Sequence, residues 1–223
     1  MSLFIITPLC LLRPLNSKNG KAFFKTFAWL MDHFGGMTIH TKNQNIVEEN
    51  HPSVLIGNHQ HNFDVLTVAG LASNWTVILG KFELGLIPYF GQIYVLCGNV
   101  LIKRGNRKQA MKSMKVLEKK ILEKELTVLV FPEGTRNPEK GLLPFKKGAF
   151  FTAVRSQTPL IPFAISDFTN QYDLNSFSRI HVYTSAYPPI PTTGLTSKDI
   201  PMLIDKSRKI IEDGIKELNK NYL

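Results

Sequence analysis

Hydrophobic and polar positions follow two spacings along the chain, one typical of strands and the other of helices. Short apolar or β-branched runs predict strands at Val54–Ile56, Thr76–Leu79, Val95–Ile102, Leu126–Phe131, Leu160–Ile165 and Ile180–Ser185. Apolar residues at helical spacing predict amphipathic helices over Lys21–Phe34, Gly105–Leu122 and Ile200–Leu218. Because strands alternate with helices, the pattern predicts an α/β domain with a mixed, largely buried central sheet flanked by helices.

The N-terminal region, residues 1–35, has a different character. The apolar run Ser2–Leu12 is interrupted by Pro8 and is shorter than the roughly 20 residues that a spanning helix needs. It lacks the basic region and the small-residue cleavage site of a signal peptide. The following aromatic-rich helix places Phe23, Phe27 and Phe34 at helical spacing. We therefore expect residues 1–35 to form a membrane-interacting helical segment, and residues 36–223 to form one folded domain. The alternative is a helix packed on the protein's own core.

Composition narrows the class of protein. Hydrophobic residues make up 43% of the 223 residues, which excludes a largely disordered chain. The two cysteines, Cys10 and Cys97, match neither a disulfide framework nor a zinc spacing, and they favour a reducing compartment.

The positive charge is concentrated in one stretch. The whole chain has 27 basic and 17 acidic residues, a net charge of +10. Between Lys103 and Lys124 there are nine basic and two acidic residues, a net +7. Such a stretch attracts nucleic acid, anionic lipid headgroups or a phosphorylated substrate, unless it is only a solvated helix face. The apolar N-terminus favours lipid over nucleic acid.

Titratable chemistry gathers in the stretch IGNHQHNFDVLT, directly after the first predicted strand. On a regular helix, Asp64 would be rotated by about 140° from His59, so the two meet only if His59 lies in a loop before a helix. Gly57 can end the strand, and Asn62 is a good N-cap for a helix that starts at Phe63. The Asp64 carboxylate would then accept the N–H of one imidazole nitrogen and leave the other nitrogen as a general base. The nucleophile would be a hydroxyl of the substrate.

Two other interpretations of this stretch remain open on the residues alone. His59, His61 and Asp64 faintly resemble a metal-ligand run, but such a site needs further ligands, and the only later histidine is His181. We expect no metal. The polar groups could also merely cap the loop and the helix.

A second polar cluster, FPEGTR, follows the predicted strand Leu126–Phe131. Arg136 can bind a phosphate with two parallel hydrogen bonds, Thr135 can donate a hydroxyl, and Gly134 lets backbone N–H groups approach a ligand. Glu133 could orient Arg136 or bind an acceptor hydroxyl. The alternative is a turn held by a Glu133–Arg136 ion pair.

Four blocks of the sequence resemble those of one family in the same order. They are NHQHNFD, GNVLIKR (Gly98–Arg104), FPEGTRN (Phe131–Asn137) and PLIPFAIS (Pro159–Ser166). The first resembles the Asn-His-x4-Asp motif of the glycerolipid acyltransferases, specifically the 1-acylglycerol-3-phosphate (lysophosphatidate) acyltransferases, and FPEGTR is the most specific match. The resemblance covers roughly Ser53 to Ser166, about half of the chain.

The resemblance implies an acyltransferase. His59, oriented by Asp64, would activate the sn-2 hydroxyl of 1-acyl-sn-glycerol-3-phosphate, and the acyl group would come from acyl-CoA or acyl-carrier protein, giving phosphatidic acid. No metal or organic cofactor is implied, and nucleic acid is not an expected partner. The protein would be membrane-associated, on the cytoplasmic face of the cell membrane.

The resemblance also assigns substrate binding to Glu133, Gly134, Thr135 and Arg136, with Lys103 and Arg104 adding positive charge. Family members often have an acidic residue where this chain has Lys103, so the acceptor could be another lysophospholipid or polar lipid. A non-catalytic binder of lipid headgroups is the alternative from another class, although it would not need both His59 and Asp64.

Overall fold

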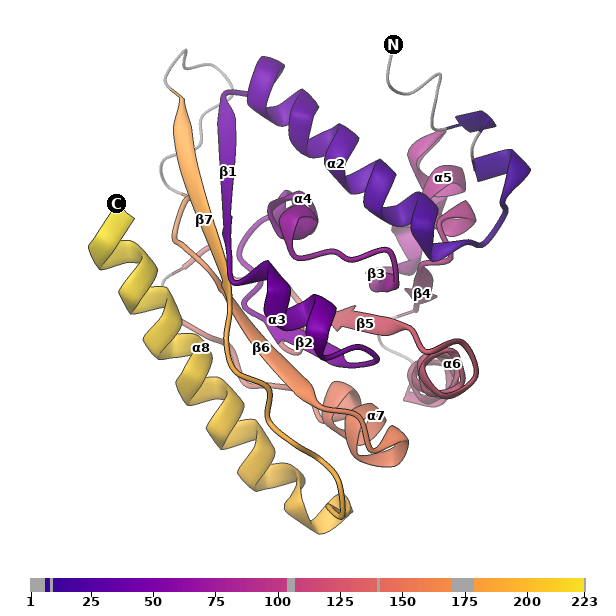
Figure 1. The fold of residues 1–223 in the computed structure, drawn as a ribbon, viewed down its shortest axis with the longest axis vertical. Coiled ribbons are helices and arrows are strands. Elements are labelled where there is room, and N and C mark those ends of the chain that lie inside the picture. Colours follow the sequence, from indigo (N-terminus) through magenta and orange to yellow (C-terminus); the bar gives the residue numbers. More distant parts are fainter. Residues whose placement is uncertain (1–6, 9, 104–106, 140, 170–178, 223) are drawn as a thin grey trace.

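Seven strands form one mixed sheet in the computed structural model, which describes residues 7–8, 10–103, 107–139, 141–169 and 179–222 (Figure 1). The strands are β1 (Met37–Lys42), β2 (Val54–Gly57), β3 (Thr76–Lys81), β4 (Val100–Ile102), β5 (Thr127–Val130), β6 (Leu160–Ile165) and β7 (Ile180–Ala186). Their order in the sheet is β1-β7-β6-β2-β5-β3-β4. Neighbouring strands are parallel except for β6 and β7, which pair antiparallel. The predicted α/β class with a mixed sheet is confirmed.

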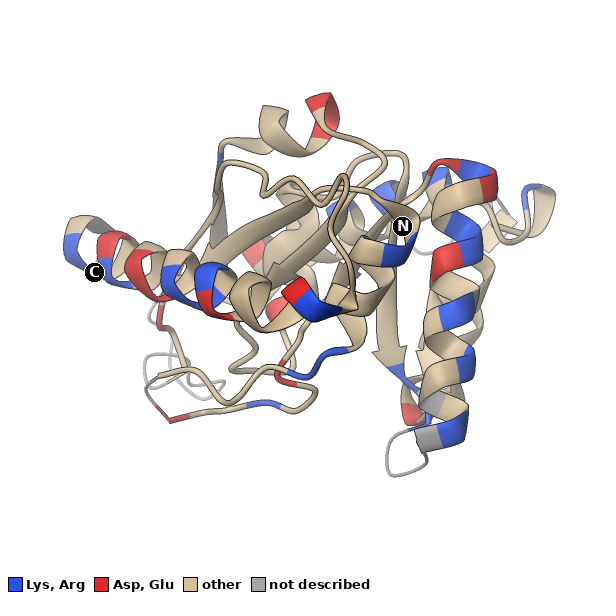
Figure 2. Cartoon of the chain, turned by 90° about the horizontal axis from the view of Figure 1, so that it is seen from below, with Lys and Arg blue, Asp and Glu red and all other residues tan. Residues whose placement is uncertain are grey.

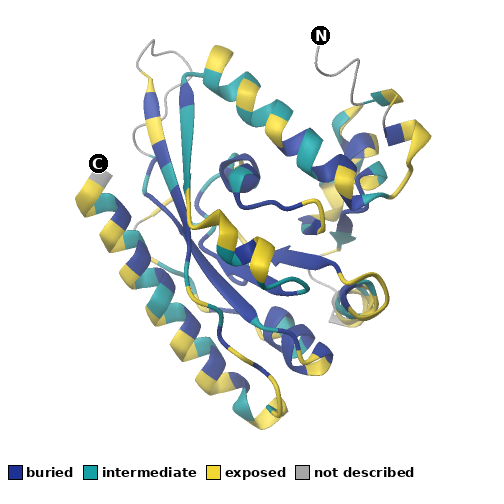
Figure 3. Cartoon of the chain, in the orientation of Figure 1, coloured by how far each residue is buried: buried dark blue, intermediate teal, exposed yellow. Residues whose placement is uncertain are grey.

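Helices cover both faces of the sheet and bury two separate cores. On one face lie α2 (Ser17–Phe34), α3 (Gln44–Glu49), α4 (Asp64–Thr67) and α5 (Phe90–Leu96), and on the other lie α6 (Arg107–Lys124), α7 (Gly148–Ser156) and α8 (Ile200–Tyr222). Strand residues alternate between the two cores, as the pleat requires. Leu55 of β2 joins the α2 side, whereas Val54 and Ile56 join the α6 side. Figure 3 shows that the sheet between them is buried.

The parallel strands β2, β3, β4, β5 and β6 bring their carboxyl ends to one edge of the sheet. Ligands of open α/β sheets bind at this edge, because the loops that leave it can carry polar side chains. The candidate residues His59 and Glu133 follow β2 and β5, which are adjacent strands. The topology therefore places the two candidate clusters beside each other.

The chain departs from the sequence prediction in several places. The segment Val95–Ile102 is a strand only over Val100–Ile102, and its first part belongs to α5. Gly98, with φ of +79°, separates the helix from the strand. Strand β1 and helices α3 and α7 were not predicted from the hydrophobic pattern.

Helix α2 packs on the sheet along one side and is exposed at its far end. Phe23 and Phe24 are fully buried in the core, whereas Trp29 and Phe34 are 47% and 79% exposed. Within the described ranges, none of the helices combines the length and the apolar character that crossing a bilayer requires. The membrane role of residues 1–35 stays a prediction.

Candidate active site

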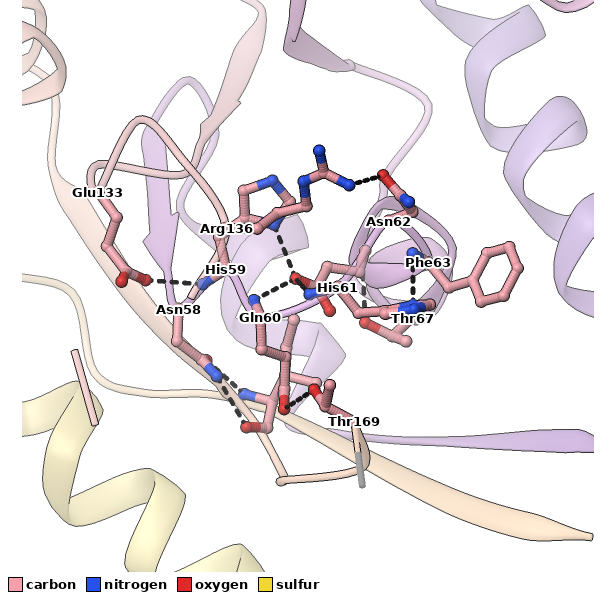
Figure 4. Close-up of polar contacts among 12 residues, drawn as sticks. Asn58, His59, Gln60, His61, Asn62, Phe63, Thr67, Glu133, Arg136 and Thr169 are labelled. Atoms are coloured by element: carbon pink, nitrogen blue, oxygen red, sulfur yellow. Dashed lines mark hydrogen bonds and ion pairs between the residues drawn. The ribbon is translucent and has the colours of Figure 1, made fainter. Parts of the chain in front are cut away.

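His59 and Asp64 meet as the sequence predicted, in the loop between β2 and α4. The imidazole Nδ1 lies 2.7 Å from Asp64 Oδ2, and the Asp64 side chain has no exposed surface. Helix α4 begins at Asp64, one residue later than expected, and Asn62 does not cap it. Instead, the side-chain oxygen Oδ1 of Asn62 accepts a hydrogen bond from Arg136 Nη1 (Figure 4). The predicted Asn62 cap is therefore wrong, while the predicted His59–Asp64 contact is present.

One oxygen of Asp64 organises the whole loop. Oδ2 accepts the hydrogen of His59 Nδ1 and also the backbone N–H groups of Gln60 and His61, at 2.6 and 2.8 Å. Because an ionised carboxylate only accepts hydrogen bonds, Nδ1 carries the proton and Nε2 keeps its lone pair. The other oxygen, Oδ1, is buried without a hydrogen-bond partner among the described residues. The geometry is that of a histidine held in one tautomer, with Nε2 as the ring nitrogen that can accept a proton.

His59 connects the loops after β2 and β5 through a ring contact and two hydrogen bonds. Its ring stacks on Phe131, with centroids 4.3 Å apart and an interplanar angle of 16°. Its backbone N–H donates to Glu133 Oε1 at 2.8 Å, and its carbonyl accepts from Asn137 N at 2.8 Å. These contacts fix the backbone and the ring plane of His59 before any substrate arrives.

Glu133 is buried and connects two loops through hydrogen bonds that its carboxylate accepts. While Oε1 holds His59, Oε2 accepts the backbone N–H of Leu143 at 2.8 Å, and the residue is only 3% exposed. Burial raises the pKa of the Glu133 carboxyl above its ordinary value of 4.5, and the two backbone donors oppose that rise. Glu133 therefore does not pair with Arg136, and the ion-paired turn considered from the sequence is not what holds this loop.

The remaining predicted residues occupy the rim of the site. Thr135 and Arg136 are exposed, and Gly134 has φ of +70°, a conformation that favours glycine. A Cβ on Gly134 would lie 2.6 Å from Lys146 Nζ, so the lysine side chain lies against this glycine. Arg136 and Lys146 thus bring two cations to the loop that follows β5.

Lys103 lies apart from this group. It is exposed directly after β4, which is three strands away from β2 in the sheet order. At about 4.8 Å per strand this is roughly 14 Å across the sheet. Arg104 lies outside the described residues.

Sequence reasoning missed two buried amides on either side of His59. Asn58 donates to Ile165 O at 3.0 Å and accepts from Ile165 N at 2.8 Å, which extends the pairing of β2 with β6. Gln60 donates to Ser166 O at 2.8 Å and accepts from Thr169 Oγ1 at 3.2 Å. The available signal was the alternation Asn-His-Gln, since successive residues of an extended chain point to opposite sides, which places Asn58 and Gln60 on one side and His59 on the other.

His61 takes no part in a metal site in the described part of the chain. No group of three or more histidine, cysteine or acidic side chains gathers there that could hold a metal ion. The His61 Nδ1 accepts the backbone N–H of Phe63 at 3.3 Å, and its ring meets Phe168 edge to face. Burial lowers the pKa of His61, which favours the neutral ring.

Comparison with known proteins gives concordant matches. The family model described as Acyltransferase matches residues 38–166. The 1-acyl-sn-glycerol-3-phosphate acyltransferase of Salmonella typhimurium is 34% identical over 211 residues, which cover 95% of this chain and 86% of that protein. The Escherichia coli protein of the same name is 35% identical with the same coverage.

More distant matches extend the comparison. The human 1-acyl-sn-glycerol-3-phosphate acyltransferase beta is 32% identical over 190 residues, which cover 84% of this chain and 68% of that protein. The crystal structure of the 1-acyl-sn-glycerophosphate (LPA) acyltransferase from Thermotoga maritima shares the fold, with a TM-score of 0.73 at 21% identity. That match covers 93% of this chain and 82% of the other.

Proposed function

The chain belongs to the acyltransferase family, and on that premise we propose that it acylates the sn-2 hydroxyl of 1-acyl-sn-glycerol-3-phosphate to form phosphatidic acid. The relatives from Salmonella typhimurium and Escherichia coli, which cover 95% of the chain, are named 1-acyl-sn-glycerol-3-phosphate acyltransferase. The observation that supports the chemistry is the 2.7 Å contact between His59 Nδ1 and Asp64 Oδ2, which leaves Nε2 as a base.

The proposed reaction is a direct acyl transfer. His59 Nε2 takes the proton of the acceptor hydroxyl while the hydroxyl oxygen attacks the thioester carbonyl carbon. The carbon–sulfur bond then breaks, and the departing thiolate takes the proton back from the imidazolium. Asp64 stabilises the imidazolium between these two steps, and a general base of this kind contributes roughly 10²–10⁴-fold to the rate.

The phosphate of the acceptor would lie against the loop after β5. Arg136 and Lys146 supply positive charge there, and Thr135 supplies a hydroxyl. Glu133 would act as a positioning residue, because both of its oxygens already hold backbone N–H groups. Lys103 would add charge at a second position on the same edge of the sheet, and Arg104 stays a substrate-binding residue predicted from the sequence.

We further propose the partners and the location. The donor is acyl-CoA or acyl-carrier protein, no cofactor takes part, and nucleic acid is not a partner. Because the acceptor is a lipid, the enzyme would work at the cytoplasmic face of the membrane. Residues 1–35 would contribute to this contact, although the buried Phe23 and Phe24 make α2 part of the acyltransferase domain as well.

The test is thiol release from an acyl-CoA by the purified protein in detergent, with and without 1-acylglycerol-3-phosphate. We expect release that depends on this acceptor and that disappears in His59→Ala. Release with another lysophospholipid in place of this acceptor would move the proposal to that lipid, with Lys103 as the first residue to examine. Full activity of His59→Ala would refute the proposed base.

A further inference from the structure

The exposed apolar side chains of this protein are concentrated at the β4 end of the sheet. Eleven of the fifteen exposed large hydrophobic side chains in the described ranges fall in three segments. They are Leu11, Leu12 and Leu15; Phe82, Leu86, Ile87, Tyr89 and Val95; and Met111, Val116 and Leu122. The second group belongs to the 3-10 helix η2 (Phe82–Leu86) and to the chain that continues into α5, and the third belongs to α6.

These three segments lie at the same end of the molecule. Thr7 Oγ1 is 2.5 Å from the Tyr89 hydroxyl, and the Cys10 sulfur is 3.9 Å from that of Cys97, so the N-terminal turn packs on the α5 region. Helix α6 follows β4, the edge strand. Figure 1 shows the N-terminal turn, α5 and α6 together on the β4 side, and Figure 3 shows exposed positions on each of them. We call the eleven side chains, together with the α6 lysines described next, the β4-side surface.

Helix α6 adds a stripe of lysines to the apolar positions. Lys108, Lys112, Lys115 and Lys119 are all exposed and follow the spacing i, i+4, i+7 and i+11. At 100° per residue they occupy one stripe, with Met111 and Leu122 along one border and Val116 along the other, all within about 140° of the helix circumference. The opposite side of α6 packs into the core through Leu117 and Ile121.

The charge of α6 is largely uncompensated, in contrast to that of α8. Helix α6 carries seven basic and two acidic residues, a net +5, whereas α8 carries five basic and four acidic residues, a net +1 (Figure 2). Of the four stripe lysines, only Lys119 has an ion pair among the described residues, with Glu123 at 3.7 Å. The stripe is therefore available to an anionic partner.

We propose that the β4-side surface docks this enzyme on membranes that contain anionic lipid. The lysine stripe of α6 would give the preference for anionic over neutral lipid. This proposal rests on the proposed function, in which acceptor and product are both anionic phospholipids. Apolar side chains beside lysines match a bilayer interface, where the apolar groups enter the acyl boundary and the ammonium groups stay among the headgroups. The contact would thus belong to the acyltransferase domain itself, in addition to residues 1–35.

The test is sedimentation of the full-length protein with vesicles, in the absence of any substrate. One set of vesicles is pure phosphatidylcholine, and the other contains phosphatidylglycerol as well. The test variant replaces Lys108, Lys112, Lys115 and Lys119 with glutamine. The matched control replaces the exposed α8 lysines Lys206, Lys209, Lys216 and Lys220 with glutamine and removes the same charge.

We expect the α6 variant to lose affinity for the anionic vesicles, by roughly fivefold for each lysine that reaches the surface. The α8 variant should bind like the wild type, and a rise in salt should abolish the difference between them. Binding to pure phosphatidylcholine should be equal for all three proteins. A second variant, Leu86→Ser with Leu122→Ser, should weaken binding to both kinds of vesicle.

Three results would overturn the proposal. The α6 variant could bind anionic vesicles like the wild type, or both lysine variants could lose the same affinity, which would indicate net charge alone. The α6 variant could also keep its vesicle binding and lose only its rate with a carrier-protein donor, which would make α6 a protein-docking helix. Because binding is measured without turnover, failure here is distinct from failure of thiol release in detergent, where the α6 variant should stay active.

Discussion

Asp64→Asn separates the charge of the Asp64 carboxylate from its geometry. The backbone N–H groups of Gln60 and His61 both point at Oδ2, so the asparagine must place its oxygen there and its amide nitrogen at the other position. The Nδ1–H of His59 therefore keeps its acceptor, and Nε2 keeps its lone pair. What the variant loses is the negative charge that stabilises the imidazolium.

The size of the effect follows from the 2.7 Å contact. A unit charge pair at that distance and an effective dielectric constant of 20 interacts by about 6 kcal/mol, which is an upper bound. The difference between a charged and a neutral hydrogen bond, about 1 kcal/mol, is a lower bound. At about 1.4 kcal/mol for each tenfold change, we expect kcat to fall roughly 10²–10³-fold, between these bounds. KM for donor and acceptor should stay the same.

Stability should change as well, because the new amide nitrogen occupies the position of Oδ1, which is buried without a partner in the described structure. An unsatisfied buried donor costs about 1–3 kcal/mol, which lowers Tm by about 2–12 °C for a chain of this size. Thiol release gives kcat and KM, and circular dichroism gives Tm. A kcat within threefold of the wild type would refute the role of the charge. A raised KM with unchanged kcat would place Asp64 in binding instead.

Four further predictions follow from the site and its surroundings. His59→Ala should lower kcat by roughly 10²–10⁴-fold in the thiol-release assay and leave vesicle binding unchanged. Arg136→Lys should raise KM for the acceptor by about 10–100-fold, because lysine cannot bind phosphate with two parallel hydrogen bonds; an unchanged KM would place the phosphate elsewhere. Burial raises the pKa of Glu133, so its contribution to stability is fully present below pH 4.5 and is lost as pH rises through the raised value. The free energy of unfolding in urea should therefore rise for Glu133→Gln relative to the wild type as pH rises from 4.5 to neutral. A difference between the two proteins that does not change with pH would contradict the burial argument. Burial and the neighbouring His181 lower the pKa of His40, so its contribution is present above pH 6.5 and is lost as pH falls through the lowered value. The Tm of His40→Asn should rise relative to that of the wild type as pH falls below 6.5. If the Tm difference between the two proteins were the same at acidic pH and above pH 6.5, the lowered pKa of His40 would be refuted.

The sequence was informative wherever the determinants are local. The contact between His59 and Asp64 joins residues only five positions apart. It depends on a strand that ends at Gly57 and on a helix that starts after the loop. The buried strands are apolar runs between turn residues, so their positions could be predicted. Strand β1 was missed because its place beside β7 depends on residues more than 140 positions away, and no local pattern encodes such a pairing.

The role of Glu133 could not have been predicted for a similar reason. Its partners are the backbone N–H groups of His59 and Leu143, which lie 74 and 10 residues away. Every residue except proline carries such a group, so the sequence contains no sign of which N–H a carboxylate will bind. The amides of Asn58 and Gln60 are similar, since their partners lie more than 100 residues along the chain.

Asp64 Oδ2 accepts three hydrogen bonds, and this determines which inactive variant suits the crystallisation of a substrate complex without turnover. Alanine at His59 removes the base and leaves the hydrogen bonds from the Gln60 and His61 backbone to Asp64 in place. Alanine at Asp64 would remove the acceptor of all three hydrogen bonds at once, and asparagine would keep that acceptor but would also leave the His59 imidazole in the site. The crystallographer's inactive enzyme should therefore be His59→Ala, soaked with donor and acceptor together, so that both ligands meet a loop in its native shape.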